Sequence, residues 1–275
     1  MPVNEFMKRT KGLFGILLMV VPMLVACDQF SEFDSPAGRG QGELTITLNA
    51  NTGFGTRAVT ESVYGNVDNY TIVVTDKDGV EKMRCKGMEI PFSMPLVLSM
   101  GSYKVEACYG VEHDASRDEF YVFGKVEGNI EPGKTEAVEV TCTPTCGRIA
   151  VSFDELMPTF FSDYNVTFTG TEALGAKTIE WRKEDTEPWY VKLKEGGEIV
   201  SFTITTTANE EFVNSNQQSV ATKKGSFTLD RNRGYKMNIS PKYNPSGTGE
   251  VGVTITIDDS TNDIPVDIEV PVDWI

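Results

Sequence analysis

The chain has 275 residues, and its 40 acidic side chains against 25 basic ones give a formal net charge of −15. This balance argues against nucleic-acid binding, because phosphate contacts require a basic face, and against electrostatic attachment to an anionic membrane surface. The length is sufficient for two domains of ordinary size, even after removal of a leader.

The chain begins with a secretory leader. Basic residues at 8, 9 and 11 precede an apolar run over 13–25, which is shorter than the ~20 residues of a membrane span and ends in small residues typical of a cleavage site. The sequence Leu24-Val25-Ala26-Cys27 resembles a bacterial lipobox. We therefore expect residues 1–26 to be a signal peptide and Cys27 to become a lipidated N-terminus; the alternative is an ordinary signal peptide that ends near a cysteine.

Residues 27–42 are predicted to form a flexible, acidic tether. Asp28, Glu32 and Asp34 follow Cys27 closely, and Ser, Pro and Gly are frequent over 31–42. An acidic stretch behind a lipidated cysteine resembles the surface-export signal of Bacteroidetes lipoproteins, and the alternative is a solvated tether. The expected location is the outer membrane or cell surface, with the lipid as the anchor.

Alternation of apolar and polar residues, the pattern of a strand with one buried face, recurs from residue 44 onward. Residues 52–58 interrupt it and are predicted to form a loop, while Asp78-Gly79 and Pro132-Gly133 mark turns. The strands expected in the first half lie at 44–48, 70–74, 80–84, 96–98, 102–109, 120–126 and 136–142.

Thr143-Pro144-Thr145 is a plausible joint, which divides a first domain (43–145) from a second (146–275). No long segment has a helical period, so the predicted fold class is all-β, with two β-sandwiches in tandem. Pro271 in the last strand cannot donate a ladder hydrogen bond, which predicts an edge position for that strand. The strands expected in this half lie at 149–153, 164–168, 200–204, 227–229, 235–239, 251–257 and 266–274.

Four cysteines remain after Cys27: Cys85, Cys108, Cys142 and Cys146. An even number in an oxidising compartment permits two disulfides in any of three pairings, and Cys142 with Cys146 could close a small loop. Four buried thiols are the alternative. A zinc site is not predicted, because the paired short spacings of zinc modules are absent, and we expect neither a metal nor a cofactor.

Enzymatic activity is not predicted. His113 is the single histidine and lies in a polar turn, no nucleophile motif accompanies it, and no carboxylate pair stands out among so many acids. Trp189 and Tyr190 are neighbours, so one of them would point outward from a strand. The exposed ring could stack on a sugar; the alternative is that one ring fills the core and the other is partly exposed.

Several motifs together resemble a known group. They are the lipobox, the strand Gly42–Leu48, the step Thr56-Arg57-Ala58, the segment Gly101–Ala107, the Pro132-Gly133 turn and the strand that ends at Cys142. The chain resembles Bacteroides lipoproteins of a domain-of-unknown-function family, related in pattern to fimbrillin-like and minor fimbrial subunits of Bacteroidales. The resemblance covers residues 42–170 and implies two transthyretin-like β-sandwich domains.

In polymerising fimbrillins a protease cuts after an arginine behind the first strand, that strand leaves, and a strand of another subunit fills the groove. If this chain follows the same scheme, as the resemblance implies, Cys27 is the lipidated residue, residues 44–48 form the strand that leaves, and Arg57 is the cut site. The donor strand would carry Val266, Ile268, Val270, Val272 and Trp274. If Arg57 is an ordinary loop residue, the first strand stays.

The expected function is that of a cell-surface lipoprotein, a fimbrial subunit, anchor or tip that acts by strand exchange and adhesion. Its expected partners are the outer membrane, through the lipid, and other fimbrial subunits. The alternative is a surface lipoprotein that binds a glycan or host ligand and has no role in a pilus.

Overall fold

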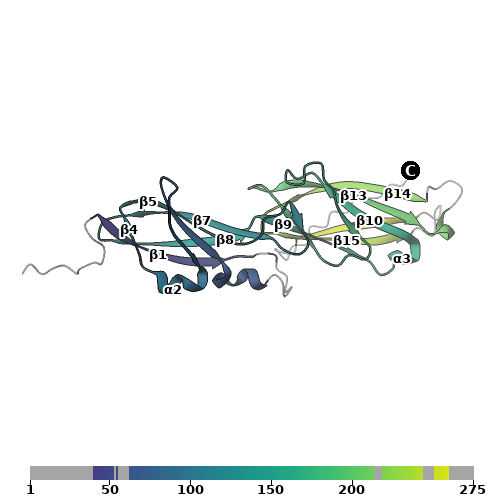
Figure 1. Ribbon diagram of the computed structural model, residues 1–275. Helices are drawn as coiled ribbons and strands as arrows, with labels where there is room; N and C mark the ends of the chain where they lie inside the picture. The colour runs from purple at the N-terminus through teal and green to yellow at the C-terminus, as the bar shows by residue number, and fades with distance from the viewer. Residues whose placement is uncertain (1–39, 53, 55–61, 214–218, 244–250, 260–275) are drawn as a thin grey trace, which may run out of the picture. The chain divides into compact units, whose positions relative to one another are not determined.

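The computed structural model describes residues 40–52, 54, 62–213, 219–243 and 251–259 (Figure 1). Most of these residues are in strands, and the helical elements are single turns, which confirms the predicted all-β class. Among the helices of these ranges, none is long and apolar enough to cross a membrane. Cys27, Arg57 and the predicted strand 266–274 lie outside the described residues.

Seven strands form the first sheet, in the order β3-β2-β5-β7-β8-β1-β4. Strands β7 and β8 pair through only two residue pairs, Val122 with Pro144 and Phe123 with Thr143. The groups β3-β2-β5-β7 and β8-β1-β4 both contribute side chains to one buried cluster. Their bounds are β1 (Gln41–Ala50), β2 (Thr71–Asp76), β3 (Glu81–Lys86), β4 (Leu96–Ser99), β5 (Gly101–Gly110), β7 (Tyr121–Ile130) and β8 (Thr135–Pro144).

Alternation explains the burial in these strands. Ile72 and Val74 of β2 are fully buried, as are Val105 and Ala107 of β5, while the residues between them are partly exposed. Because alternate side chains of a strand point to opposite faces, one face of each strand enters the cluster. A Cβ on Gly124 of β7 would lie 2.5 Å from the carbonyl oxygen of Thr141, so a glycine is needed for β7 to approach β8 so closely.

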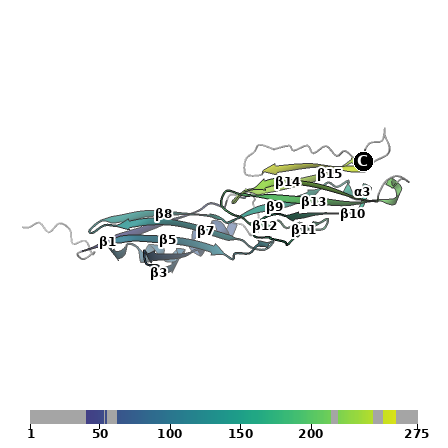
Figure 2. The same ribbon diagram turned by 90° about the horizontal axis from the view of Figure 1, so that it is seen from above.

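The second half forms two sheets, β11-β10-β13-β14 and β16-β15-β9-β12-β6 (Figures 1 and 2). Both contribute to a second buried cluster, with Phe168 and Phe202 from one sheet and Ile239 and Ile255 from the other, as in a sandwich. The bounds are β6 (Ala115–Ser116), β9 (Cys146–Phe153), β10 (Phe161–Thr169), β11 (Ile179–Arg182), β12 (Trp189–Lys192), β13 (Glu198–Ala208), β14 (Val220–Leu229), β15 (Gly234–Tyr243) and β16 (Val251–Asp259).

The helical elements are single turns between strands. Pro91 in α2 and Pro158 in α3 stand near the helix start, where proline is tolerated because its missing N–H has no partner there. The bounds are α2 (Ile90–Ser93), α3 (Met157–Phe160), η1 (Val63–Gly65), η2 (Val67–Asn69), η3 (Gly87–Glu89) and η4 (Glu210–Phe212).

One strand crosses the predicted joint. The two-residue strand β6 comes from the first half of the sequence, yet it pairs with β12, with Ser116 opposite Tyr190 and Ala115 opposite Val191. Tyr190 in turn packs in the first buried cluster. The boundary at residue 145 stays a prediction, and these contacts join the segments on its two sides.

Candidate functional site

The first candidate site is the seat of β1, by which we mean the groove between β8 and β4 that this strand fills. This strand lies between β8, to which it runs parallel, and β4, to which it runs antiparallel. The N–H of Glu43 donates to the carbonyl of Lys134 (2.8 Å), and the N–H of Asn51 donates to that of Cys142 (2.9 Å). The removal of β1 would therefore leave a row of unpaired acceptors along β8 and detach β4 from its neighbour.

The core face of β1 explains why it stays in place. Leu44 is fully buried, Ile46 is 5% exposed, and Leu48 packs against the same cluster. At the start of the strand, a Cβ on Gly42 would collide with the carbonyl oxygen of Glu131. The strand therefore fits closely against the turn that precedes β8, and a larger residue at position 42 would push it out.

A buried aromatic residue, Phe54, follows β1 directly. Its side chain is 1% exposed and lies edge-on to Phe120, with ring centroids 5.2 Å apart, and 5.6 Å from Tyr190 of β12. The ring of Tyr64 stacks on that of Phe120, with ring centroids 3.8 Å apart. The predicted loop at 52–58 thus contains a core residue, which sequence analysis missed because Gly53 and Gly55 on either side indicate a turn.

The hydroxyl groups of this aromatic cluster are satisfied. The Tyr70 hydroxyl donates to the carbonyl of Tyr64 (2.7 Å), and the N–H of Phe120 donates to the Tyr64 hydroxyl (3.3 Å). Burial raises the pKa of both phenols above their ordinary value. Both tyrosines are therefore neutral at physiological pH and act as structural groups around Phe54.

The loop over residues 111–119 fastens the first half to the second. Arg117 donates to the carboxylate of Asp185 (2.6 Å) and to the carbonyls of Glu180 (3.0 Å) and Glu187. Two further ion pairs flank it, Glu112 with Lys192 (2.9 Å) and Asp114 with Lys177 (2.8 Å). The hydrogen bond from Lys177 holds the pKa of the Asp114 carboxyl below its ordinary value.

Trp189 and Tyr190 do not form an exposed platform. Tyr190 is 5% exposed and packs 4.7 Å from Phe120. Trp189 is partly exposed; its Nε1 donates to the carbonyl of Glu180 (3.1 Å), and the Arg117 guanidinium lies over its ring. The arrangement matches the alternative in which one ring fills the core and the other is partly exposed.

All four described cysteines carry thiols. Cys142 and Cys146 are buried, and Cys85 and Cys108 are partly exposed. Cys142 lies in β8 and Cys146 begins β9, and Thr145 between the two strands forms a bend. The disulfide pairing stays a prediction, and only two of these four thiols are buried as the alternative expects.

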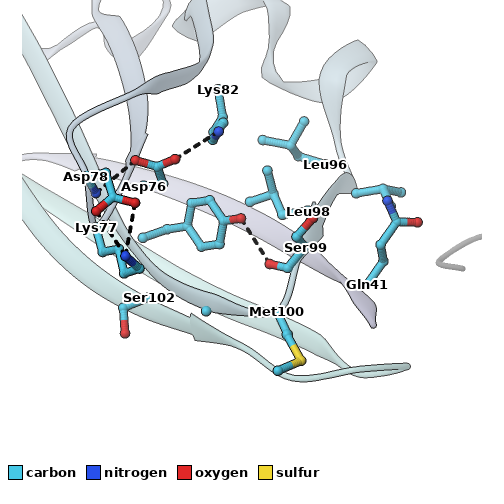
Figure 3. Close-up of a pocket in the computed structure, with 13 residues that line it drawn as sticks. Gln41, Asp76, Lys77, Asp78, Lys82, Leu96, Leu98, Ser99, Met100 and Ser102 are labelled. Atoms are coloured by element: carbon cyan, nitrogen blue, oxygen red, sulfur yellow. Dashed lines mark hydrogen bonds and ion pairs between the residues drawn. The ribbon is translucent and has the colours of Figure 1, made fainter. Parts of the chain in front are cut away.

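A pocket of about 440 Å³ lies between the two outer strands of the first sheet. In Figure 3, Asp76 reaches Lys82 on one wall (2.8 Å), while Leu96 and Leu98 of β4 line the other. The carboxylate of Asp76 also accepts the N–H groups of Asp78 and Val80, both at 2.9 Å. These contacts hold the pKa of the Asp76 carboxyl low. The charged groups are satisfied within the pocket, and sequence analysis did not find it.

The chain belongs to the family described as Domain of unknown function (DUF4493), whose model matches residues 40–272. No protein with a curated description matches the sequence significantly. The assignment agrees with the predicted membership of a domain-of-unknown-function family.

The solved structures that match this chain include proteins from Bacteroidales species. A fimbrial assembly protein from Parabacteroides distasonis is 12% identical, with a TM-score of 0.41 over 81% of this chain and 96% of that one. A candidate adhesin from Bacteroides ovatus is 12% identical, with a TM-score of 0.43 over 79% and 92%. The fimbrial anchor protein Mfa2 from Porphyromonas gingivalis is 9% identical, with a TM-score of 0.34 over 79% and 98%. No conclusion about activity follows from likeness at this level.

Proposed function

We propose that the protein is a cell-surface lipoprotein of fimbrial type, a subunit, anchor or tip that is first attached through Cys27 and, after a cut behind Arg57, acts by exchange of β1. The position of β1 carries the proposal. The strand lies between two neighbours, follows the predicted tether directly, and is followed by Phe54 and then by Arg57. A cut after Arg57 would separate β1 and Phe54 from the rest of the chain.

The energetics permit the exchange but require a replacement. Each large apolar side chain that leaves the core costs about 1.5–3 kcal/mol, so the departure of Leu44, Ile46, Leu48 and Phe54 costs about 6–12 kcal/mol. The exposed edge of β8 would add unpaired backbone groups. An extended segment from another subunit would restore both the core contacts and the ladder, which favours strand addition over an empty groove.

A reversible disulfide tests the exchange. Thr47 of β1 lies directly opposite Glu139 of β8, and both side chains are exposed. Under oxidising conditions the double variant Thr47→Cys/Glu139→Cys would pin β1 to β8. We expect it to lose assembly into fibres at the cell surface, and to regain assembly when a reductant opens the disulfide.

The control is a disulfide between strands that do not exchange. Thr167 of β10 lies opposite Thr203 of β13, and the variant Thr167→Cys/Thr203→Cys should assemble normally under both conditions. Assembly of the oxidised Thr47→Cys/Glu139→Cys variant at the wild-type level would show that β1 does not leave.

The pocket beside Leu96 and Leu98 favours a second function, the binding of a glycan or host ligand at the surface without a role in a pilus. It combines an apolar wall with the polar groups of Gln41 and Lys82. A glycan array would test this function: binding that Lys82→Ala abolishes while the fold stays intact would support it, and silence across a broad array would contradict it.

A further inference from the structure

Among the described residues, the outer edge of β16 has no neighbouring strand. In the ranges that the structure describes, β16 pairs with β15 alone. It ends at Asp259, and 16 residues of sequence follow. An open edge with apolar side chains beneath it is a place where a further strand adds.

The hydrogen bonds of β15 show which groups face this edge. The carbonyl of Arg233 accepts the N–H of Arg148 (2.9 Å), and that of Ile239 accepts the N–H of Asp154 (2.8 Å). The backbone N–H and C=O groups of the odd-numbered residues of β15 therefore point toward β9. The backbone groups of its even-numbered residues therefore point toward β16, where Ser240 lies opposite Thr254. Along β16, the N–H and C=O groups of the odd-numbered residues consequently point to the open edge. They belong to Val253, Ile255 and Ile257, whose side chains are buried.

The sequence after β16 fits one such edge. Over 266–274 the even-numbered residues are apolar, and the prolines stand at odd positions, 265 and 271. Because alternate N–H groups of a strand point to opposite sides, both prolines lie on the same side. The side of the segment that carries the prolines cannot form a complete ladder of backbone hydrogen bonds, whereas the other side keeps all of its N–H donors. The segment is therefore suited to a single neighbour.

We propose that residues 266–274 pair antiparallel with the outer edge of β16 in the same molecule. With 260–265 as the connection, Ile268 lies opposite Ile257, Val270 opposite Ile255, and Val272 opposite Val253. Opposite residues share a face, so the apolar residues of the segment continue the buried face of β16. In the same register Pro271 points away from β16, and Pro265 lies in the connection.

The segment fits the seat of β1 less well. The odd-numbered N–H groups of β1 donate to β8, as Glu43 and Asn51 show. A second copy's segment that entered in the direction of β1, with its apolar residues in the core, would put Pro271 at a donor position. Where the proposed function holds, a chain that keeps its last strand can accept a strand but cannot give one, which places it at an end of the fibre. The donor role of 266–274 stays a prediction, and this proposal is its alternative.

Hydrogen exchange of the purified chain tests the pairing without reference to any fibre. The amides of Val253, Ile255 and Ile257 should exchange at least about tenfold more slowly than those of Asp267, Glu269 and Asp273. This protection should be the same in dilute and concentrated samples. Rapid exchange at the β16 edge would overturn the proposal, and so would protection that appears only on concentration, since that indicates pairing between copies.

Two proline variants test the polarity of the segment. Ile268→Pro removes a donor that faces β16 and should abolish protection of the edge, whereas Glu269→Pro removes a donor that faces away and should preserve it. Ile268→Ala controls for the lost side chain and should keep most of the protection. Equal effects of the two proline variants would contradict the register.

Discussion

The guanidinium carbon of Arg117 lies 4.5 Å from the ring centroid of Trp189. The same guanidinium lies 4.9 Å from the ring of Trp181, which is 1% exposed. One cation from the loop between β5 and β7 is thus held by two rings of the second half, and it also donates to Asp185. A cation over an aromatic face contributes about 0.5–2 kcal/mol, more when it is desolvated.

Replacement of Arg117 should therefore weaken the attachment of this loop. We expect Arg117→Ala to lower the free energy of unfolding by about 1–3 kcal/mol, measured by urea denaturation. Arg117→Lys should recover only part of the loss, because a lysine cannot form the planar fork. Arg182→Ala removes an exposed arginine that pairs with Glu180 and should leave stability nearly unchanged. Equal effects of Arg117→Ala and Arg182→Ala would contradict this role.

Phe54 should behave as a core residue although it lies in a loop. The truncation Phe54→Ala leaves a cavity between Phe120 and Tyr190, and we expect it to cost about 3–5 kcal/mol of unfolding free energy. Phe54→Leu keeps most of the volume and should cost less. Val63→Ala, at a residue that is 44% exposed, is the matched surface control. An unchanged denaturation midpoint for Phe54→Ala would show that the residue does not fill the core.

Cys142 provides a reporter for the departure of β1. It lies opposite Ala50, at the end of β1, and is 1% exposed. We expect iodoacetamide at pH 8 to leave it unmodified in the intact protein and to label it after β1 has been released by a cut behind Arg57. Mass spectrometry of the labelled peptides distinguishes Cys142 from Cys85, which is partly exposed from the start. Labelling of Cys142 at the same rate before and after the cut would contradict the exchange.

Alkaline pH should destabilise the first buried cluster. Burial raises the pKa of the Cys142 thiol to about 12 and raises the pKa of the Tyr64 phenol above its ordinary value. These groups ionise earlier in the unfolded chain, so their contribution to stability is complete below pH 9 and is lost as the pH rises toward 12. Urea midpoints at pH 8 to 11 should fall, and they should fall less steeply for Cys142→Ala. Equal slopes for the two proteins would contradict the assignment to Cys142.

The sequence was informative wherever alternation was long. The run over 44–48 predicted β1 and its buried face, and the run over 251–257 predicted β16, because a period of two residues is unambiguous over such lengths. The strands β6, β11 and β12 have two to four residues, which is too few to show a period. Their positions follow from tertiary contacts.

The contact between Arg117 and Trp189 likewise could not be predicted from local sequence. Arg117 and its ring partner Trp189 are separated by 72 positions, and nothing in the residues between them indicates that they meet. The burial of Phe54 could not be predicted for a different reason, since its glycine neighbours are typical of a turn. Cys27 and Arg57, by contrast, were found by motif alone, and their roles rest on chemistry that measurement of the mature chain can reveal.

The N-terminal residue of the protein isolated from cell-surface fibres tests the central proposal most directly. If β1 is exchanged after cleavage at Arg57, Edman degradation or mass spectrometry should find Ala58 at the start of the mature chain. If every surface copy instead begins at a lipidated Cys27 and retains β1, the exchange does not take place.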